Sequence, residues 1–190
     1  IEELWMKSRY DELILGDWLL ESGTLLRDGR LAYKTYGELN EEKSNAILLC
    51  SHIAGTHENY EPLIQIGHCF DPSRYFVIAT NMFANGLSSS PTNTPAPQNG
   101  PYFPEITIRD NVRAQHILVT ERLNINRIAL VAGYSMGAQQ TFQWAVSNPD
   151  MVDHIAPWCG HARTTGHTWA FLEGMASVAL LGPDWKGGLY

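Results

Sequence analysis

Residues 127–140 read RIALVAGYSMGAQQ, and this stretch decides the fold. The apolar run 127–132 predicts a buried strand, and the segment QQTFQWAVS at residues 139–147 predicts a helix. A G-x-S-x-G motif lies between them, with Ser135 at its centre. A chain that passes from strand to helix in so few residues strains the central residue and crowds its neighbours, which explains the two glycines. The pattern predicts a sharp turn that projects the Ser135 hydroxyl over the carboxyl edge of a sheet.

Four other segments are typical of strands. Residues 46–50 (AILLC) and 75–80 (YFVIAT) are apolar runs that predict strands buried on both faces. Residues 31–36 (LAYKTY) alternate apolar and polar side chains, as a half-exposed strand near a sheet edge does, and residues 152–156 form a weaker candidate that ends at a proline. Because these runs alternate with helical patterns, we expect an α/β fold with a mostly parallel sheet flanked by helices.

The region before the turn contains a capped helix and a long loop. Thr107 and Asp110 predict a helix cap, and the four apolar residues that follow at helical spacing predict one buried face: Ile108, Val112, Val119 and Leu123. Residues 81–104 carry five prolines and two glycines, which indicates a long, ordered loop. Loops of this length in compact domains are usually functional.

The chain divides by composition near residue 160. Residues 1–160 are expected to form the N-terminal part of the α/β core. The stretch from Cys159 to Leu181 is helical in pattern and apolar, with Trp169 and Phe171 among its large side chains. We therefore expect residues 161–190 to begin a helical lid.

Composition and charge limit the partners and the compartment. The net charge of −7, without any cluster of lysine and arginine, disfavours nucleic acid and anionic membranes as partners. Three widely spaced cysteines with no C-x-x-C pair disfavour disulfides and zinc sites, and His52 and His57 lie in a loop at a spacing that does not suit zinc, so no metal is expected. The first residues do not resemble a signal peptide, and no apolar stretch approaches the ~20 residues that cross a bilayer. These features predict a cytoplasmic protein.

A serine nucleophile in this setting needs two backbone N–H groups that bind the developing oxyanion. The N–H of Met136, directly after Ser135, is the expected first donor. The loop SHIAGT at residues 51–56 follows an apolar strand and is expected to supply the second, with Ile53 the preferred donor and Ala54 the alternative. Tyr134 and Ala54 are candidates for contact with substrate, although Tyr134 either lines a substrate pocket or packs against its neighbours, and packing is the favoured interpretation for it.

Residues 103–152 resemble the homoserine O-acetyltransferase family of α/β-hydrolase enzymes. The segments TIRD, VRAQ, GxSMG and QWAVxxPD occur here in the order typical of that family, and residues 36–57 and 86–94 are similar as well. Deacetylcephalosporin C acetyltransferases resemble the same pattern. The resemblance implies an α/β-hydrolase fold with a helical lid after the sixth strand. It also implies that Ser135 takes an acetyl group from acetyl-CoA and passes it to a hydroxyl group.

One departure from the family affects the substrate. Family members that bind homoserine carry an arginine on the helix after the sixth strand, whereas residues 173–177 read EGMAS and the nearest cation is Arg163. Loss of an arginine that pairs with a carboxylate disfavours homoserine. We therefore expect O-acyl transfer through acyl-Ser135 from acetyl-CoA or another acyl-CoA, with no bound cofactor and a small alcohol or ester as substrate. The alternatives are a carboxylic ester hydrolase on the same scaffold and a non-catalytic binding module.

The partners of Ser135 in a catalytic triad are expected outside this chain. In this fold the acid and the histidine follow the serine, and both lie well beyond the turn. Only about 53 residues follow Gly137, and three histidines among them come too early: His154, His161 and His167. We expect a C-terminal segment or a second chain to complete the fold, and a homodimer is a further expectation.

Overall fold

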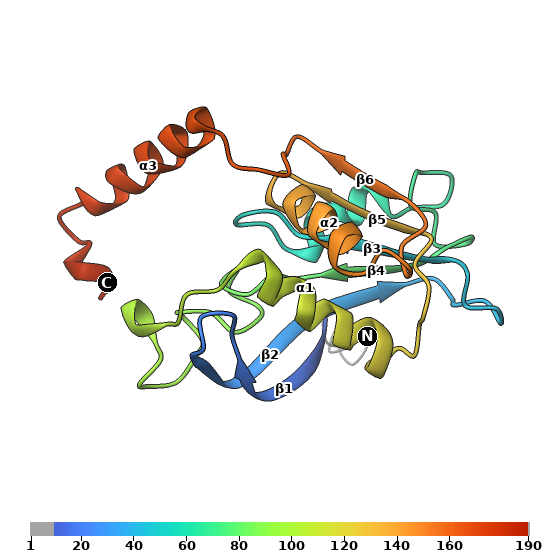
Figure 1. Cartoon of the computed structure of the whole chain (residues 1–190), viewed down its shortest axis with the longest axis horizontal. Coiled ribbons are helices and arrows are strands. Elements are labelled where there is room, and N and C mark those ends of the chain that lie inside the picture. The colour runs from blue at the N-terminus through green and yellow to red at the C-terminus, as the bar shows by residue number, and fades with distance from the viewer. Residues whose placement is uncertain (1–9, 190) are drawn as a thin grey trace, which may run out of the picture.

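The computed structural model describes residues 10–189 of the chain, and within them six strands form one sheet (Figure 1). The strands are β1 (Asp11–Leu19), β2 (Leu25–Tyr36), β3 (Ala46–Cys50), β4 (Phe76–Thr80), β5 (Leu130–Tyr134) and β6 (Ile155–Trp158). Their spatial order is β1-β2-β4-β3-β5-β6. The pairs β4–β3, β3–β5 and β5–β6 are parallel, whereas β2 pairs antiparallel with both β1 and β4. The predicted α/β fold with a mostly parallel sheet is confirmed.

Strand β3 explains why the central strands are continuously apolar. All five of its residues are buried. Leu48 and Cys50 point into the core beneath helices α1 (Ile108–Ile117) and α2 (Met136–Ser147), while Ile47 and Leu49 point into a second core on the opposite face. The second core lies under the short helix η2 (His57–Leu63) and the segment that follows it. A parallel strand covered on both faces has no solvent side to carry polar residues.

Two strand predictions were displaced and one strand was missed. β5 begins at Leu130 instead of residue 127 and continues to Tyr134, and β6 runs to Trp158 with Pro157 inside it, opposite Gly133. Proline is tolerated there because, in the described part of the chain, β6 pairs on one side only. β1 was missed because its register shifts on both sides of Gly16, which breaks the alternating pattern that sequence analysis relies on.

The predicted cap of α1 is confirmed in detail. The Thr107 hydroxyl accepts a hydrogen bond from the Asp110 N–H at 3.2 Å, and the Asp110 carboxylate accepts one from the Thr107 N–H at 3.1 Å. Asp110 is wholly buried and also accepts from the Glu21 N–H at 2.8 Å, so the cap ties the helix to the β1–β2 hairpin. Val112 and Val119 are buried against the sheet as predicted, and the helix continues through the π-helical segment η4 (Leu118–Arg122).

The proline-rich loop at residues 81–104 has a polar interior of its own. The side chain of Ser88 accepts a hydrogen bond from the Ala32 N–H at 2.8 Å, and that of Ser89 accepts from the Arg30 N–H at 2.9 Å. The loop includes the short helix η3 (Gly100–Tyr102). It therefore satisfies backbone groups of β2, which agrees with the prediction of an ordered loop.

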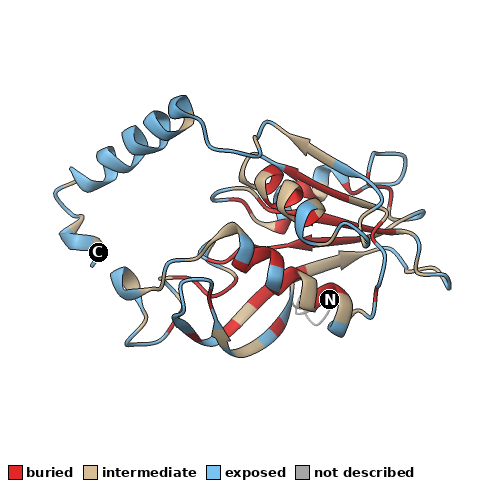
Figure 2. Cartoon of the chain, in the orientation of Figure 1, coloured by how far each residue is buried: buried red, intermediate tan, exposed pale blue. Residues whose placement is uncertain are grey.

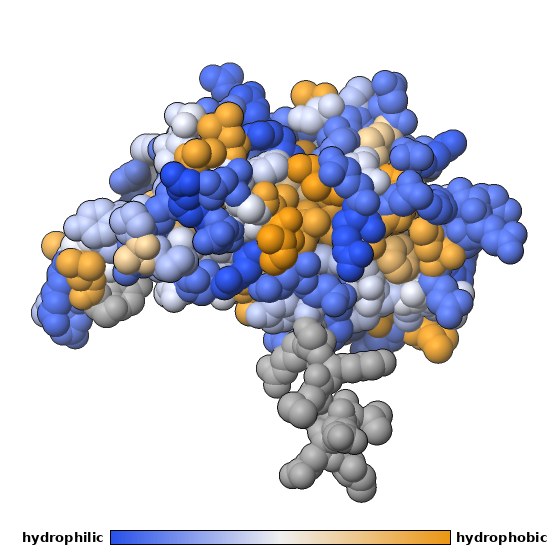
Figure 3. Space-filling model, turned by 90° about the horizontal axis from the view of Figure 1, so that it is seen from below, coloured by the Kyte–Doolittle hydropathy of each residue, from blue (hydrophilic) through white to orange (hydrophobic). Residues whose placement is uncertain are grey.

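The last described helix, α3 (Gly166–Leu180), stands away from the sheet, and a short helical turn, η5 (Lys186–Gly188), follows it (Figure 1). No residue of α3 is buried and all but Thr168 are exposed (Figure 2), and Trp169 and Phe171 are each 62% exposed. On the face that Figure 3 shows, apolar surface is divided into separate patches by polar side chains. Among the described residues, no helix is long and apolar enough to cross a membrane.

We expect loss of the α1 cap to lower the stability of the protein. Thr107→Ala removes the acceptor of the Asp110 N–H and a hydroxyl whose one proton faces the carboxylates of Glu21, at 2.7 Å, and Asp110, at 3.1 Å. We expect the free energy of unfolding to fall by about 1 kcal/mol, as for other N-cap residues. Urea titration of the full-length gene product measures the loss, and Thr107→Ser, which keeps the hydroxyl, is the control. An equal loss in both variants would assign the effect to the threonine methyl group instead of the cap.

Candidate active site

Ser135 is the single residue between β5 and α2. Its backbone angles are φ 55° and ψ −113°, in a region that residues other than glycine seldom adopt. Such a conformation costs roughly 1–3 kcal/mol and persists only where its surroundings enforce it. Here the Ser135 N–H donates to the Trp158 carbonyl of β6 at 3.0 Å, and the Ser135 carbonyl accepts from the Ala138 N–H at 3.0 Å. The strained turn predicted from the sequence is therefore present and is held on both sides.

The two motif glycines are required by their neighbours. A Cβ on Gly133 would collide with the backbone of Gly137, and a Cβ on Gly137 would collide with the Cys50 carbonyl at the end of β3. Strand β5, helix α2 and strand β3 therefore approach one another more closely here than any side chain allows. This close approach brings the Ser135 turn against the end of β3.

A third glycine at this site was not found by sequence analysis. A Cβ on Gly160 would lie 2.6 Å from the Ser135 carbonyl oxygen and 2.5 Å from the Ala138 Cβ. Gly160 follows β6 and belongs to no motif, so nothing local in the sequence indicates its role. Its importance follows only from the pairing of β6 with β5.

The loop at residues 51–56 lies beside the Ser135 turn, as the oxyanion prediction requires. The Gln140 side chain of α2 donates to the Ser51 carbonyl at 2.8 Å, and Gly137 packs on the Cys50 carbonyl. Within the described residues, no hydrogen bond occupies the N–H groups of Met136, Ile53 or Ala54. These three groups are therefore free to bind a ligand oxygen. Ile53 is half exposed and Ala54 has a positive φ of 56°, and the choice between them remains a prediction.

Tyr134 belongs to an aromatic group around the turn. Its ring meets the edge of His52, with 5.5 Å between ring centroids, and lies 6.4 Å from the Trp158 ring. Tyr134 is 40% exposed, so it packs on its neighbours and also presents part of its ring to solvent beside Ser135. A role of Tyr134 or Ala54 in binding substrate remains a prediction.

No histidine among residues 10–189 hydrogen-bonds the Ser135 hydroxyl. His154 lies at the opposite end of β6, where its Nδ1 is 3.2 Å from the Ala129 carbonyl. His167 lies on the exposed helix α3. His161 follows Gly160, but its buried Nε2 has no hydrogen-bond partner. The described residues therefore bring no general base into contact with the serine.

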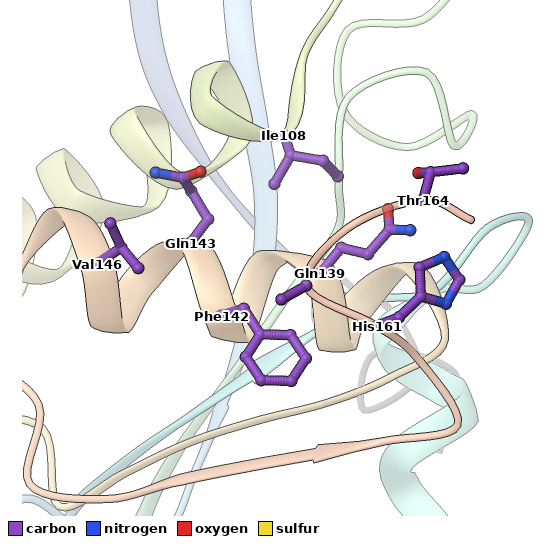
Figure 4. Close-up of a pocket in the computed structure, with 8 residues that line it drawn as sticks. Ile108, Gln139, Phe142, Gln143, Val146, His161 and Thr164 are labelled. Atoms are coloured by element: carbon purple, nitrogen blue, oxygen red, sulfur yellow. The ribbon is translucent and has the colours of Figure 1, made fainter. Parts of the chain in front are cut away.

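A cavity of about 250 Å³ lies one helical turn beyond Ser135 (Figure 4). Figure 4 shows Gln139, Phe142 and Gln143 of α2 on one side, with His161 and Thr164 of the segment after β6 near one end. Its lining carries no carboxylate, lysine or arginine, and Ser135 is not part of it. The cavity therefore lies beside the turn without including Ser135, and it offers a ligand no carboxylate, lysine or arginine side chain.

The cysteines and other potential ligands are dispersed in the described part of the chain. No group of three or more His, Cys, Asp or Glu residues there could hold a metal ion. The three cysteines are free: Cys69 and Cys159 are exposed, and Cys50 is buried at the end of β3. Complete burial raises the pKa of the Cys50 thiol well above its ordinary value, so this thiol stays protonated and behaves as an apolar side chain.

Residues 45–180 match the family described as the alpha/beta hydrolase fold. The chain belongs to the α/β-hydrolase family. Its strained serine between a buried strand and a helix is the feature that this family places at the carboxyl edge of its sheet.

The similar proteins within the α/β hydrolases include esterases and acetyltransferases. An ethyl acetate hydrolase of Pseudomonas veronii is 43% identical over 181 residues, covering 94% of this chain and 52% of that protein. A homoserine O-acetyltransferase of Mesorhizobium japonicum is 38% identical over 187 residues, covering 90% of this chain and 48% of that protein. The crystal structure of an acetylester hydrolase from Corynebacterium glutamicum has a TM-score of 0.92 at 40% identity, covering 95% of this chain and 52% of that one.

This chain thus spans about half the length of the curated relatives it matches. The resemblance to homoserine O-acetyltransferases that the motifs indicated is confirmed, and the esterases are similar as well.

The close contact at Gly160 predicts that a larger residue there destabilises the protein. In Gly160→Ala the new methyl group must displace the Ser135 backbone or Ala138, and we expect a loss of about 1–3 kcal/mol in the free energy of unfolding, typical of overpacking. Gly166→Ala is the matched control, because a Cβ there meets nothing within 4 Å. Urea unfolding of the full-length gene product measures both. If Gly160→Ala were as stable as Gly166→Ala, the close approach of β6 to the Ser135 turn would be wrong.

Proposed function

We propose that this chain carries the nucleophile and the oxyanion donors of a serine esterase that hydrolyses acetyl esters of small alcohols. The observation that carries the proposal is the backbone of Ser135, whose strained conformation is enforced from both sides, as is typical of residues at active sites. Support for the substrate class comes from the similar proteins named ethyl acetate hydrolase and acetylester hydrolase.

The proposed reaction proceeds through an acyl-enzyme. The Ser135 oxygen attacks the ester carbonyl while a general base takes the hydroxyl proton, and the carbonyl oxygen becomes an oxyanion. The N–H of Met136 and that of Ile53 or Ala54 bind this oxyanion. The C–O bond to the alcohol then breaks, and the base returns the proton to the departing alcohol. Water then attacks acyl-Ser135 while the same base takes one of its protons. The bond between the acyl carbon and the Ser135 oxygen breaks, the base returns the proton to that oxygen, and the carboxylic acid is released.

The base and its acidic partner are proposed to come from outside residues 10–189. None of the described histidines contacts the Ser135 hydroxyl, and Ser135 without a base is a weak nucleophile. A C-terminal segment or a second chain would then supply them. In the same proposal, residues 161–190 begin the lid, since α3 carries apolar side chains that the described residues do not cover.

Hydrolysis is preferred here over acyl transfer, which reverses the preference drawn from the motifs alone. The esterases are 40–43% identical to this chain, whereas the homoserine O-acetyltransferase of M. japonicum is 38% identical. Helix α3 carries no arginine, and its single charged residue is Glu173. A substrate carboxylate would therefore meet no cation on this helix.

Transfer from an acyl-CoA to an alcohol is the second candidate. It is supported by the TIRD and VRAQ segments, which resemble those of the acetyltransferases, and by the relative at 38% identity. Both reactions share acyl-Ser135 and differ only in the acceptor. Transfer to an alcohol requires a site that keeps water away from the acyl-enzyme, whereas hydrolysis requires water to reach it.

Ser135→Ala tests the nucleophile. We expect kcat for p-nitrophenyl acetate to fall by roughly 10⁴-fold or more in the full-length gene product, because no other group can form the acyl-enzyme. Ser147→Ala, at the far end of α2, is the control and should retain activity. A fluorophosphonate should label the wild-type peptide that contains Ser135. Labelling elsewhere, or undiminished turnover in Ser135→Ala, would reject the proposal.

The acceptor of the acyl group is tested by measuring how much acyl-enzyme reacts with water and how much reacts with an added alcohol. With p-nitrophenyl acetate and increasing concentrations of a primary alcohol or homoserine, an esterase releases chiefly acetate, whereas a transferase forms the acetylated alcohol. We expect acetate to dominate and acetyl-CoA to be a poor donor, measured by product chromatography and thiol release. Dominant transfer, with fast release of CoA, would favour the second candidate while leaving Ser135 as the nucleophile.

A further inference from the structure

The strands β3 and β5 separate at the site, and one side chain fills the gap between them. Their parallel pairing ends at Cys50 and Gly133. Beyond this point β3 enters the loop at residues 51–56, and β5 enters the Ser135 turn. The hydroxyl of Tyr60 lies between the two chains, where it donates to the Cys50 carbonyl at 2.7 Å and accepts from the Tyr134 N–H at 3.1 Å. The hydroxyl therefore replaces the backbone hydrogen bond that would come next if the pairing of β3 with β5 continued.

The position of this hydroxyl is firmly held. Tyr60 is 3% exposed, and its ring packs in the apolar core with Leu49 and Ala132 and meets Trp158 edge-on, with 6.2 Å between centroids. Burial, as the main cause, raises the pKa of its phenol well above the ordinary value. The phenol thus stays protonated, and it acts as donor to one strand and as acceptor from the other.

The two partners of Tyr60 adjoin the two halves of the proposed site. Tyr134 is bonded directly to Ser135, the proposed nucleophile, which is in turn bonded to Met136, the proposed first oxyanion donor. Cys50 leads into the loop that carries Ile53 and Ala54. The hydroxyl therefore couples the backbone that places the nucleophile to the backbone that places the second donor.

We propose that Tyr60 is a positioning residue that sets the spacing between the Ser135 turn and the oxyanion loop, an inference that rests on the proposed function. Removal of its hydroxyl leaves one bond fewer at the Cys50 carbonyl and at the Tyr134 N–H. The strands then have no bridge where they diverge. A displacement of about 1 Å between a nucleophile and an oxyanion donor can cost about 10²-fold in rate. The effect is on kcat, because the spacing matters most when charge develops on the substrate oxygen.

The matched control is a buried hydroxyl that also donates to a carbonyl of β3 but belongs to β4, which does not pair with β5. Thr80 of β4 donates to the carbonyl of Leu49, the residue before Cys50, at 3.3 Å, and Thr80 is wholly buried. Thr80→Val removes a hydrogen bond from a β3 carbonyl at nearly constant volume. It therefore reports the purely structural cost of losing such a bond.

The experiment compares Tyr60→Phe with Thr80→Val in the full-length gene product, using p-nitrophenyl acetate. We expect Tyr60→Phe to lower kcat by roughly 10- to 100-fold with KM changed by less than about twofold, while Thr80→Val keeps kcat within about twofold. The infrared carbonyl stretch of acyl-Ser135 should move to higher frequency in Tyr60→Phe only, because the oxyanion donors polarise the carbonyl less. A kcat and carbonyl stretch like those of Thr80→Val would show that Tyr60 is merely structural and would overturn the inference.

A second measurement covers the case in which Tyr60→Phe does not fold. Fluorinated tyrosines at position 60 keep the ring and the hydroxyl but make the hydroxyl a stronger donor and a weaker acceptor. A kcat that changes progressively with fluorination supports the inference, and an unchanged kcat overturns it. Turnover that survives Ser135→Ala would reject the proposed function itself. An inactive Ser135→Ala together with an unaffected Tyr60→Phe would reject only the role of Tyr60.

Discussion

The close approach of β3, β5 and α2 at Ser135 is the constraint on which the rest of the structure depends. A residue at φ 55° and ψ −113° between a strand and a helix is unfavourable by itself. It is held because Gly133 and Gly137 let the backbones meet and because β6 binds the Ser135 N–H from the side. Each neighbouring element thus helps to hold the φ and ψ angles of Ser135. The two glycines stand where the backbones lie too close for a side chain.

Buried amides extend this constraint to the helices. The Trp144 indole donates to Gln115 at 2.7 Å, Gln115 donates to Gln140 at 2.7 Å, and Gln140 donates to the Ser51 carbonyl at 2.8 Å. All four residues are buried. The chain of bonds runs from α2 to α1, back to α2 and then to the loop beside the serine. Every member has a partner, so the network costs little and specifies one arrangement. It gives the VRAQ and GAQQ segments a physical role.

The balance between hydrolysis and transfer depends on parts of the site other than the serine turn. The proposed nucleophile and oxyanion donors would serve both reactions, and the group that approaches the proposed acyl-Ser135 would decide which product forms. In this chain the side chains around the turn include Tyr134, Trp158 and His52, and a separate cavity, whose lining does not include Ser135, lies between α2 and His161. None of these residues is a lysine or arginine that could pair with an amino-acid carboxylate, and this supports the esterase proposal beside the similarity.

The sequence by itself determined the parts that obey local rules. The apolar run of β3, the capping box at Thr107 and the glycines around Ser135 each leave a pattern within a few residues, and all three were predicted correctly. The place of the loop at residues 51–56 beside Ser135 was also predictable, because parallel strands β3 and β5 end at the same edge of the sheet, whereas its role in binding an oxyanion stays a prediction.

Only the tertiary structure decided which distant groups meet. The strand β1 with its shifted register, the need for a glycine at position 160 and the place of the Tyr60 hydroxyl have no local signature. Each arises from contact between segments far apart in the chain. The sequence around Tyr60 gives no sign of whether its ring only packs in the core or its hydroxyl also bridges two strands. Local sequence encodes the period and the caps of an element, whereas the packing of elements determines which buried hydroxyl or missing Cβ matters.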